Sequence, residues 1–267
     1  MALVKTTIDG KDIEVERDRW ALDVAREMGI DIPALCHHAA LEPYGACRLC
    51  VVEVTKGKWT WLTTSCDLPV REGLSIRTDS PAVLNARKTT LELLWAEVPE
   101  ASELQDLAHQ LGLEGPRFNP RSKTGRCILC GLCVRACKKI LGQSAISFSN
   151  RGAYRTVGTP FDEPSDTCIG CRACVAICPT GHIRSVDVGA VRRIETWHTE
   201  LEQARCQECG QPFAAVKELE FIRANLPEHI APEAVCPSCK RKETVQRLSG
   251  ITNPRSAAAP RQEADAG

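Results

Sequence analysis

The stretch CILCGLCVRAC, at residues 127–137, carries four cysteines separated by two, two and three residues. The same spacing returns in CIGCRACVAICP, at residues 168–179. Three cysteines at this spacing wrap one face of a [4Fe–4S] cubane, and in a two-cluster arrangement the fourth cysteine of each motif binds the other cluster. The repeat therefore predicts one cubane on Cys127, Cys130, Cys133 and Cys178, and a second on Cys168, Cys171, Cys174 and Cys137.

All 16 cysteines of the 267-residue chain fall into groups of four, and the two motifs account for half of them. The remaining two groups are Cys36, Cys47, Cys50 and Cys66, and Cys206, Cys209, Cys236 and Cys239. Tetrahedral metal centres and iron–sulfur clusters both take four ligands, whereas disulfides require only an even number of cysteines. This partition indicates four metal sites.

Composition limits the class of protein. Hydrophobic residues make up 43% of the chain, which is typical of folded protein, and the formal net charge is zero. A large electrostatic surface for nucleic acid is therefore not expected. The N-terminal residues do not resemble a secretion leader, and no apolar run is long enough to span a membrane. We expect a cytoplasmic protein with reduced thiols, because metal binding is then a more frequent use of cysteine than disulfide formation.

The first cysteine group lies in a segment that is predicted to form mainly strands. Asp9-Gly10 between two alternating runs predicts a β-hairpin, and one helix is expected before the first ligand, at Ala21–Met28. The glycine-bearing loop Tyr44–Cys50 can wrap a cluster of two irons and donate backbone N–H groups to its sulfurs. The group predicts a [2Fe–2S] cluster; a zinc site or buried free cysteines are the alternatives. His37 and His38 are possible extra ligands, although a place at the surface or beside the ligands is the more ordinary one.

Two helices are expected after this segment. Ser80 and Pro81 provide an N-cap and a first helical residue for a helix that runs to about Glu97. Ser102 and Gln105 have the spacing of a capping box for a second helix that ends at Gly112.

The fourth cysteine group consists of two Cys-x2-Cys knuckles, 206–209 and 236–239, with a helix expected between them at Ala214–Ala224. Paired knuckles suit a structural zinc ion bound by four thiolates. A further iron–sulfur cluster is the alternative. Lys240, Arg241 and Lys242 give only a weak indication of nucleic-acid binding, because the chain as a whole is not basic.

The motifs GACRLCVVEV (45–54) and SCDLPV (65–70) resemble the first domain of the large iron–sulfur subunit of respiratory complex I. They are equally similar to the diaphorase iron–sulfur subunit of NAD-linked [NiFe] hydrogenases and formate dehydrogenases. Residues 126–183 resemble bacterial-type ferredoxins. The complex I and hydrogenase family usually carries one histidine and three cysteines for a further cluster between these parts, and here no cysteine occurs between Cys66 and Cys127.

The expected fold is α+β, with an N-terminal β-grasp [2Fe–2S] ferredoxin domain and a bacterial-type 2[4Fe–4S] ferredoxin domain as its principal parts. The expected boundaries are 1–79 for the β-grasp domain, 80–120 for a helical linker without the histidine-plus-three-cysteine loop, 121–190 for the 2[4Fe–4S] domain, 191–250 for a zinc-ribbon-like four-cysteine domain, and 251–267 for a disordered tail.

No recognisable nucleotide-binding or hydrolase motif occurs in the sequence, so no catalytic residue is predicted. The resemblance implies an electron-transfer subunit of a cytosolic multisubunit oxidoreductase. Its partners would be a flavin- and NAD(P)-binding diaphorase subunit and a catalytic subunit of hydrogenase or formate dehydrogenase type. The resemblance extends to electron-bifurcating complexes of this kind. Two alternatives remain: a free-standing ferredoxin that serves several enzymes, and a regulatory iron–sulfur and zinc protein that binds nucleic acid.

Overall fold

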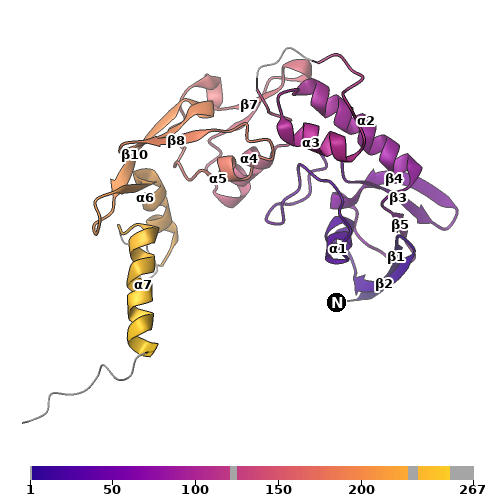
Figure 1. Cartoon of the computed structure of the whole chain (residues 1–267), viewed down its shortest axis with the longest axis horizontal. Coiled ribbons are helices and arrows are strands. Elements are labelled where there is room, and N and C mark those ends of the chain that lie inside the picture. The colour runs from indigo at the N-terminus through magenta and orange to yellow at the C-terminus, as the bar shows by residue number, and fades with distance from the viewer. Residues whose placement is uncertain (1, 121–124, 228–233, 253–267) are drawn as a thin grey trace, which may run out of the picture. The chain divides into compact units, whose positions relative to one another are not determined.

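The computed structural model describes residues 2–120, 125–227 and 234–252 (Figure 1). The chain divides into two compact units. The first comprises residues 1–167, 172–185 and 194–199, and the second comprises residues 168–171, 186–193 and 200–267. Within the described residues, no helix is both long and apolar enough to cross a membrane. Most of the expected tail, residues 253–267, lies outside the described residues.

The first unit begins with a five-stranded sheet in the order β2-β1-β5-β3-β4. Strands β1 and β5 pair in parallel, and the other neighbours are antiparallel. The Asp9-Gly10 hairpin is present, with both residues at positive φ. The elements are β1 (Leu3–Ile8), β2 (Lys11–Glu16), α1 (Ala21–Glu27), β3 (Val51–Lys56), β4 (Trp59–Thr64), the 3-10 turn η1 (Ser65–Asp67) and β5 (Ser75–Arg77).

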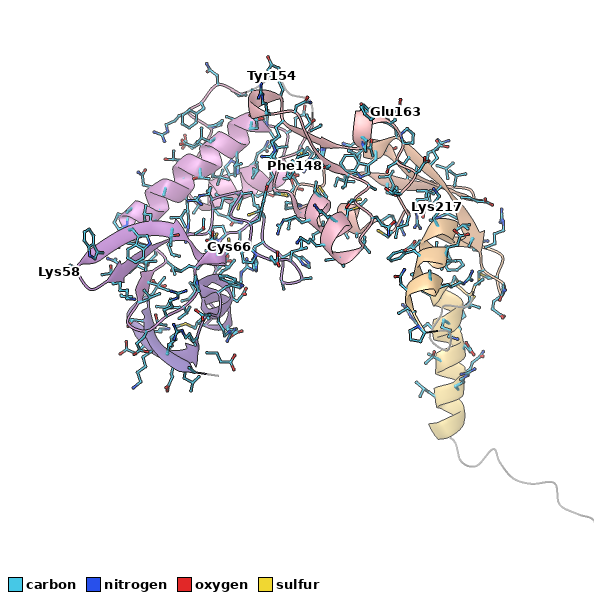
Figure 2. The ribbon with its side chains drawn as sticks, turned by 180° about the vertical axis from the view of Figure 1, so that it is seen from behind. Lys58, Cys66, Phe148, Tyr154, Glu163 and Lys217 are labelled. Carbon is cyan, nitrogen blue, oxygen red and sulfur yellow. The ribbon has the colours of Figure 1, made fainter. Side chains whose placement is uncertain are left out.

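Helix α1 packs on this sheet. Its Leu22 and Val24 are buried together with Val52, Val54 and Ile76 of the sheet, and Cys50 and Cys66 belong to the same core. Figure 2 shows Cys66 in the interior of this part and Lys58 at the tip of the β3–β4 hairpin. The β-grasp core therefore supports two of the four thiols of the first group directly.

Two helices follow, α2 (Pro81–Glu97) and α3 (Ser102–Gln110). Helix α2 begins as expected, because Ser80 Oγ accepts a hydrogen bond from the Val83 N–H (3.3 Å). The expected capping box of α3 is wrong. Ala101 is the N-cap, Ser102 is already helical, and Gln105 Nε2 donates to the Pro99 carbonyl (2.7 Å) instead of reaching back to Ser102.

The cubane motifs adopt short helices separated by a hairpin. Their elements are α4 (Leu132–Arg135), a π-helical turn η2 (Ala136–Ile140), β6 (Ser147–Ser149), η3 (Gly152–Tyr154), β7 (Thr156–Gly158), η4 (Pro160–Asp162) and α5 (Ala173–Ala176). Strands β6 and β7 pair antiparallel. Each short helix starts from a residue in the left-handed region, Gly131 for α4 and Arg172 for α5.

The second unit is built on a four-stranded sheet in the order β11-β10-β9-β8, which the sequence patterns did not reveal. The sheet and the helices after it are β8 (Ser185–Val188), β9 (Val191–Ile194), β10 (Thr199–Arg205), β11 (Pro212–Ala215), α6 (Val216–Asn225) and α7 (Pro237–Thr252). The turn η5 (Glu195–Trp197), between β9 and β10 in the sequence, belongs to the first unit. Helix α6 starts two residues later than expected, because Ala214 and Ala215 pair with β10.

A buried arginine connects this sheet to the second cubane motif. Arg192 is 1% exposed and donates to the carbonyls of Gly170 (2.9 Å) and Phe213 (3.3 Å). It also pairs with Asp187 and Glu218. A buried charge is tolerated only when it is paired and hydrogen-bonded, so these four partners explain how the guanidinium can lie in the interior.

We predict that Gly170→Ala destabilises the second unit by about 2 kcal/mol, since a Cβ there would overlap its neighbours. That atom would lie 2.9 Å from Ala215 Cβ and 3.0 Å from Leu201 Cδ1, and φ is +73°. Hydrogen exchange of the β10 and β11 amides in the metal-loaded chain measures the effect. Gly189→Ala is the control, because Gly189 also has positive φ but nothing lies within 4 Å of its Cβ position. Equal effects of the two substitutions would contradict the packing explanation.

Candidate metal centres

The four thiols of the first group are all buried: Cys36, Cys47, Cys50 and Cys66 are between 1% and 4% exposed. They interact in two pairs. The Cys47 thiol and backbone N–H groups lower the pKa of Cys36 to about 6, and the Cys66 thiol lowers the pKa of Cys50 to about 7. Two irons that share two sulfides each need two further thiolates, so two neighbouring pairs suit a [2Fe–2S] cluster.

The backbone around this group is held by specific contacts. The Cys47 N–H donates to Cys36 Sγ (3.3 Å), which is the kind of N–H···S bond that tunes a cluster. At the other end of the loop, Ser65 Oγ donates to the Cys50 carbonyl (2.8 Å). Arg87 of α2, 4% exposed, donates to the Val51 carbonyl (2.7 Å). The loop is therefore anchored by α2 as well as by its own sheet.

The two neighbouring histidines bond to other groups. His37 Nε2 lies 3.2 Å from Asp23 Oδ1, and burial lowers the pKa of this imidazole. His38 Nδ1 accepts the Ala40 N–H (3.1 Å). These contacts suit a supporting role beside the cysteines rather than a place among the ligands.

The second set of thiols lines one small cavity in the first unit. Its walls include Cys127, Cys130, Cys133 and Cys178, so the fourth cysteine of the second motif lies beside the first three of the first motif. Thr180, which is 1% exposed, also lines the cavity. Its hydroxyl donates to the Arg126 carbonyl (2.6 Å) and lies 3.8 Å from Cys178 Sγ. This contact fixes the end of one motif against the start of the other.

Burial makes two of these thiols, Cys130 and Cys133, poor acids by themselves. It raises the pKa of Cys130 to about 11 and raises that of Cys133 further. Neighbouring cysteines add to the shift, since like charges would repel. Thiolates are the form that binds metal, so a cationic metal centre is what can stabilise four ionised sulfurs in this cavity. The donor set fits a [4Fe–4S] cluster.

The third set is divided between the units: Cys137 and Cys174 lie in the first, and Cys168 and Cys171 in the second. Local contacts prepare one of them for ligation, because the Ala145 N–H donates to Cys137 Sγ (3.3 Å). The joint binding of a second cubane by these four residues stays a prediction.

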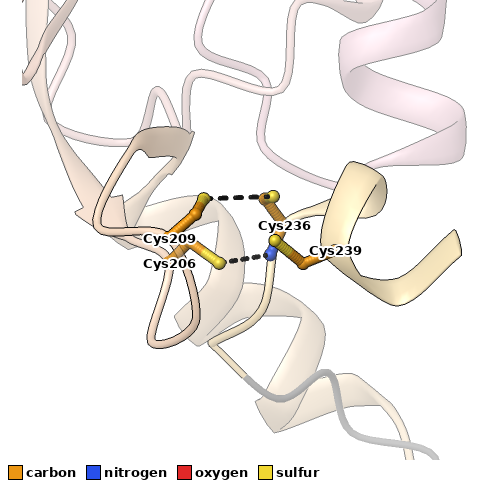
Figure 3. A group of neighbouring side chains, drawn as sticks. All are labelled: Cys206, Cys209, Cys236 and Cys239. Carbon is orange, nitrogen blue, oxygen red and sulfur yellow. Dashed lines mark hydrogen bonds between the residues drawn. The ribbon is translucent and has the colours of Figure 1, made fainter. Parts of the chain in front are cut away.

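The fourth group gathers tightly in the second unit. The sulfurs of Cys206, Cys209, Cys236 and Cys239 all lie within 4.8 Å of one another (Figure 3). The Cys236 N–H donates to Cys206 Sγ (3.2 Å), and this and other backbone N–H groups lower the pKa of Cys206 to about 6. The two knuckles turn alike, since the Gly210 N–H bonds the Cys206 carbonyl and the Lys240 N–H bonds the Cys236 carbonyl.

These distances distinguish a single ion from a cluster. The sulfurs of Cys209 and Cys236 are 3.8 Å apart, and thiolates placed tetrahedrally about one Zn²⁺ at about 2.3 Å are separated by about 3.8 Å. A cubane places each thiolate on a different iron, which requires a wider separation. The fourth group therefore fits one tetrahedral ion.

Sequence reasoning found the sixteen thiols but missed several residues that hold them. Arg87, Thr180 and Arg192 bond to backbone carbonyls beside cysteines that are far away in the sequence. No spacing rule indicates such contacts. The sequence offered one signal for these residues: each is a polar residue within a stretch that is otherwise apolar or that lies beside a cysteine motif.

Two family descriptions match the chain: "2Fe-2S iron-sulfur cluster binding domain" over residues 2–81 and "4Fe-4S dicluster domain" over residues 167–215. NADPH-Fe(3+) oxidoreductase subunit alpha of Geobacter sulfurreducens is 33% identical over 206 residues, which are 68% of this chain and 24% of the relative. NADP-reducing hydrogenase subunit HndD of Solidesulfovibrio fructosivorans is 35% identical over 212 residues, 68% of this chain and 36% of the relative.

One subunit of the NADH-quinone oxidoreductase of Rhizobium meliloti is 28% identical over 83% of this chain and 29% of its own length. The chain thus spans between 24% and 36% of the length of these curated relatives. A solved structure, NAD+-reducing [NiFe]-hydrogenase in the H2-reduced state, contains a chain with 30% identity and a TM-score of 0.57. That match covers 67% of this chain and 86% of the other. The expected fold class and the resemblance are confirmed.

We predict that Thr180→Val destabilises the first cubane motif by about 1 to 2 kcal/mol, because the part-buried Arg126 carbonyl loses the hydrogen bond from the buried Thr180 hydroxyl. The expected result is faster iron loss on exposure to air, measured by absorbance. Thr156→Val is the matched control, since its hydroxyl bonds Ser149 at an exposed position. Iron loss at the same rate in both variants would contradict the supporting role of Thr180.

Proposed function

We propose that this chain, a member of the family of iron–sulfur subunits found in NADH-quinone oxidoreductase and in NAD+-reducing [NiFe]-hydrogenase, transfers electrons within a multisubunit oxidoreductase. One partner would bind flavin and NAD(P), and another would hold the catalytic metal, of hydrogenase or formate dehydrogenase type. The chain itself would carry out no substrate chemistry.

The observation that carries this proposal is a single apolar core around two sets of thiols. Cys36 and Cys47 of the first group and Cys130 of the second group are buried in it. Leu49, Ile128 and Leu132, each less than 10% exposed, belong to the same core. Iron–sulfur clusters supply one-electron chemistry, and their potentials depend on exposure to solvent and on hydrogen bonds to sulfur. These side chains shield Cys36, Cys47 and Cys130, and thus part of each site, from water.

The helical linker, residues 80–120, contains no cysteine and supports this arrangement by packing. Leu91 and Trp95 of α2 and Leu104 and Ala108 of α3 fill the same core. His109, the histidine of this segment, packs edge-on against Trp95, with ring centroids 6.1 Å apart. In this proposal the helices of the linker take the structural place of a ligand loop, and electrons pass between the first group and the first cubane motif.

We assign the cofactors as one [2Fe–2S] cluster, two [4Fe–4S] clusters and one zinc ion on the fourth group. The sulfur separations in the fourth group support zinc over a further cluster. The zinc ion would be structural, because four protein thiolates leave no open coordination position for a substrate.

Metal analysis tests this assignment. Anaerobically purified chain should contain about ten iron atoms and about one zinc ion. Cys206→Ser should remove zinc and leave iron, whereas Cys47→Ser should remove the [2Fe–2S] electron paramagnetic resonance (EPR) signal and leave the cubane signals and zinc. About fourteen iron atoms without zinc would overturn the zinc assignment, and loss of every signal in Cys47→Ser would show that the sites do not assemble separately.

Partner identification tests the function. The tagged chain, purified anaerobically under native conditions from its own cells, should bring along a flavin-binding NAD(P)-linked subunit and a subunit that holds a catalytic metal. Mass spectrometry of the eluate identifies both. A chain that elutes alone and fully loaded with iron would contradict the subunit proposal and favour a free carrier.

A further inference from the structure

The two cubane motifs share their cysteine spacing but differ at five of the seven positions between their cysteines. At three of these five, counting from the cysteines, Leu129 corresponds to Gly170, Gly131 to Arg172, and Arg135 to Ala176. The first two positions have positive φ in both motifs, between 54° and 73°. Since Leu129 and Arg172 adopt this conformation with side chains, the backbone alone does not require glycine. Each glycine must instead be explained by what lies against it.

Gly131 lies against the ligand loop of the first cysteine group. A Cβ at this position would lie 3.2 Å from Tyr44 Cε1 and 3.1 Å from Phe148 Cζ. Tyr44 begins the loop that carries Cys47 and Cys50. A side chain at Gly131 would therefore require Tyr44 or Phe148 to shift, whereas the second motif has an exposed arginine at the equivalent position.

Arg135, at the end of α4, reaches the same loop region. Its Nη2 donates to the carbonyl of Cys36 (2.8 Å), and its Nη1 donates to the carbonyl of Glu42 (2.6 Å). The guanidinium also lies over the Tyr44 ring, 4.9 Å from the centroid. One planar cation thus contacts three residues of the segment between the first two ligands of the first group, a geometry that the arginine fork provides and a lysine cannot.

We propose that Arg135 is a positioning residue that holds the Cys36–Cys47 segment against the first cubane motif and raises the reduction potential of the [2Fe–2S] site. The inference rests on the proposed cofactors and electron-transfer function. Reduction of that site takes up one electron from a reductant and forms or breaks no bond. The added negative charge is stabilised by the nearby, half-buried guanidinium of Arg135. Ala176, the equivalent residue of the second motif, has no charge and cannot stabilise a reduced cluster in this way.

The test is an EPR-monitored redox titration of the full chain, reduced with dithionite in the presence of mediators. Arg135→Gln should lower the [2Fe–2S] potential, with about a tenfold smaller equilibrium constant for one-electron reduction, which is about 59 mV. Lys138→Gln is the matched control, since it removes the same charge from an exposed side chain three residues further along. Its [2Fe–2S] potential should equal that of the wild-type chain.

A third variant separates the effect of the guanidinium's hydrogen-bonding geometry on the potential from the effect of its charge. Arg135→Lys keeps the charge but cannot donate to both carbonyls, so it should recover only part of the shift. Full recovery by lysine, or the same potential in Arg135→Gln and Lys138→Gln, would overturn the positioning role. Failure of the underlying function is distinguishable, because the wild-type chain would then lack the [2Fe–2S] signal altogether. Iron content, measured in every variant, should stay at the wild-type value.

Discussion

The rest of the structure depends on one constraint: thiols that are buried from water can ionise only where hydrogen bonds or a metal stabilise the negative charge. Burial raises the pKa of Cys130 to about 11, whereas donated N–H groups lower that of Cys206 to about 6. In the proposed assignment, folding of each cysteine segment is therefore linked to the metal that it would bind. This linkage would explain how a chain with only 4% aromatic residues can form several small parts, since metal–thiolate bonds would stabilise what a modest apolar core cannot.

Arginines connect these parts, and they do so through carbonyls rather than through the thiols themselves. Arg87 bonds the carbonyl after Cys50, Arg135 bonds that of Cys36, and Arg192 bonds that of Gly170 within the second cubane motif. Each cation thereby fixes the backbone next to a predicted ligand and places positive charge close to it. A cluster whose surroundings are set by side chains from other segments can be tuned without any change in its own motif, which explains why two motifs of identical spacing need not be equivalent.

The sequence was informative where chemistry is local. The Asp9-Gly10 hairpin and the Ser80 cap follow from turn geometry and capping, and both agree with the structure. The fourth cysteine group follows from ligand count, and its four sulfurs lie together. Contacts between residues far apart in the sequence could not be predicted from sequence patterns. The sheet β8 to β11 was missed because strands such as TELEQAR carry mostly polar residues, and a buried Arg192 contradicts the usual surface role of arginine. The capping box at Ser102 failed because Ala101 is the N-cap, and the Gln105 side chain donates to the Pro99 carbonyl instead.

The central claim is that three of the four groups of thiols hold separate iron–sulfur clusters that exchange electrons inside one chain. Spin quantitation by EPR of the fully reduced chain tests it most directly. We expect one unpaired spin for each of the three clusters, with line broadening from magnetic interaction between the [2Fe–2S] site and the first cubane, whose ligands share a buried core. A spin count that corresponds to fewer clusters, or three sharp signals without any interaction, would contradict it.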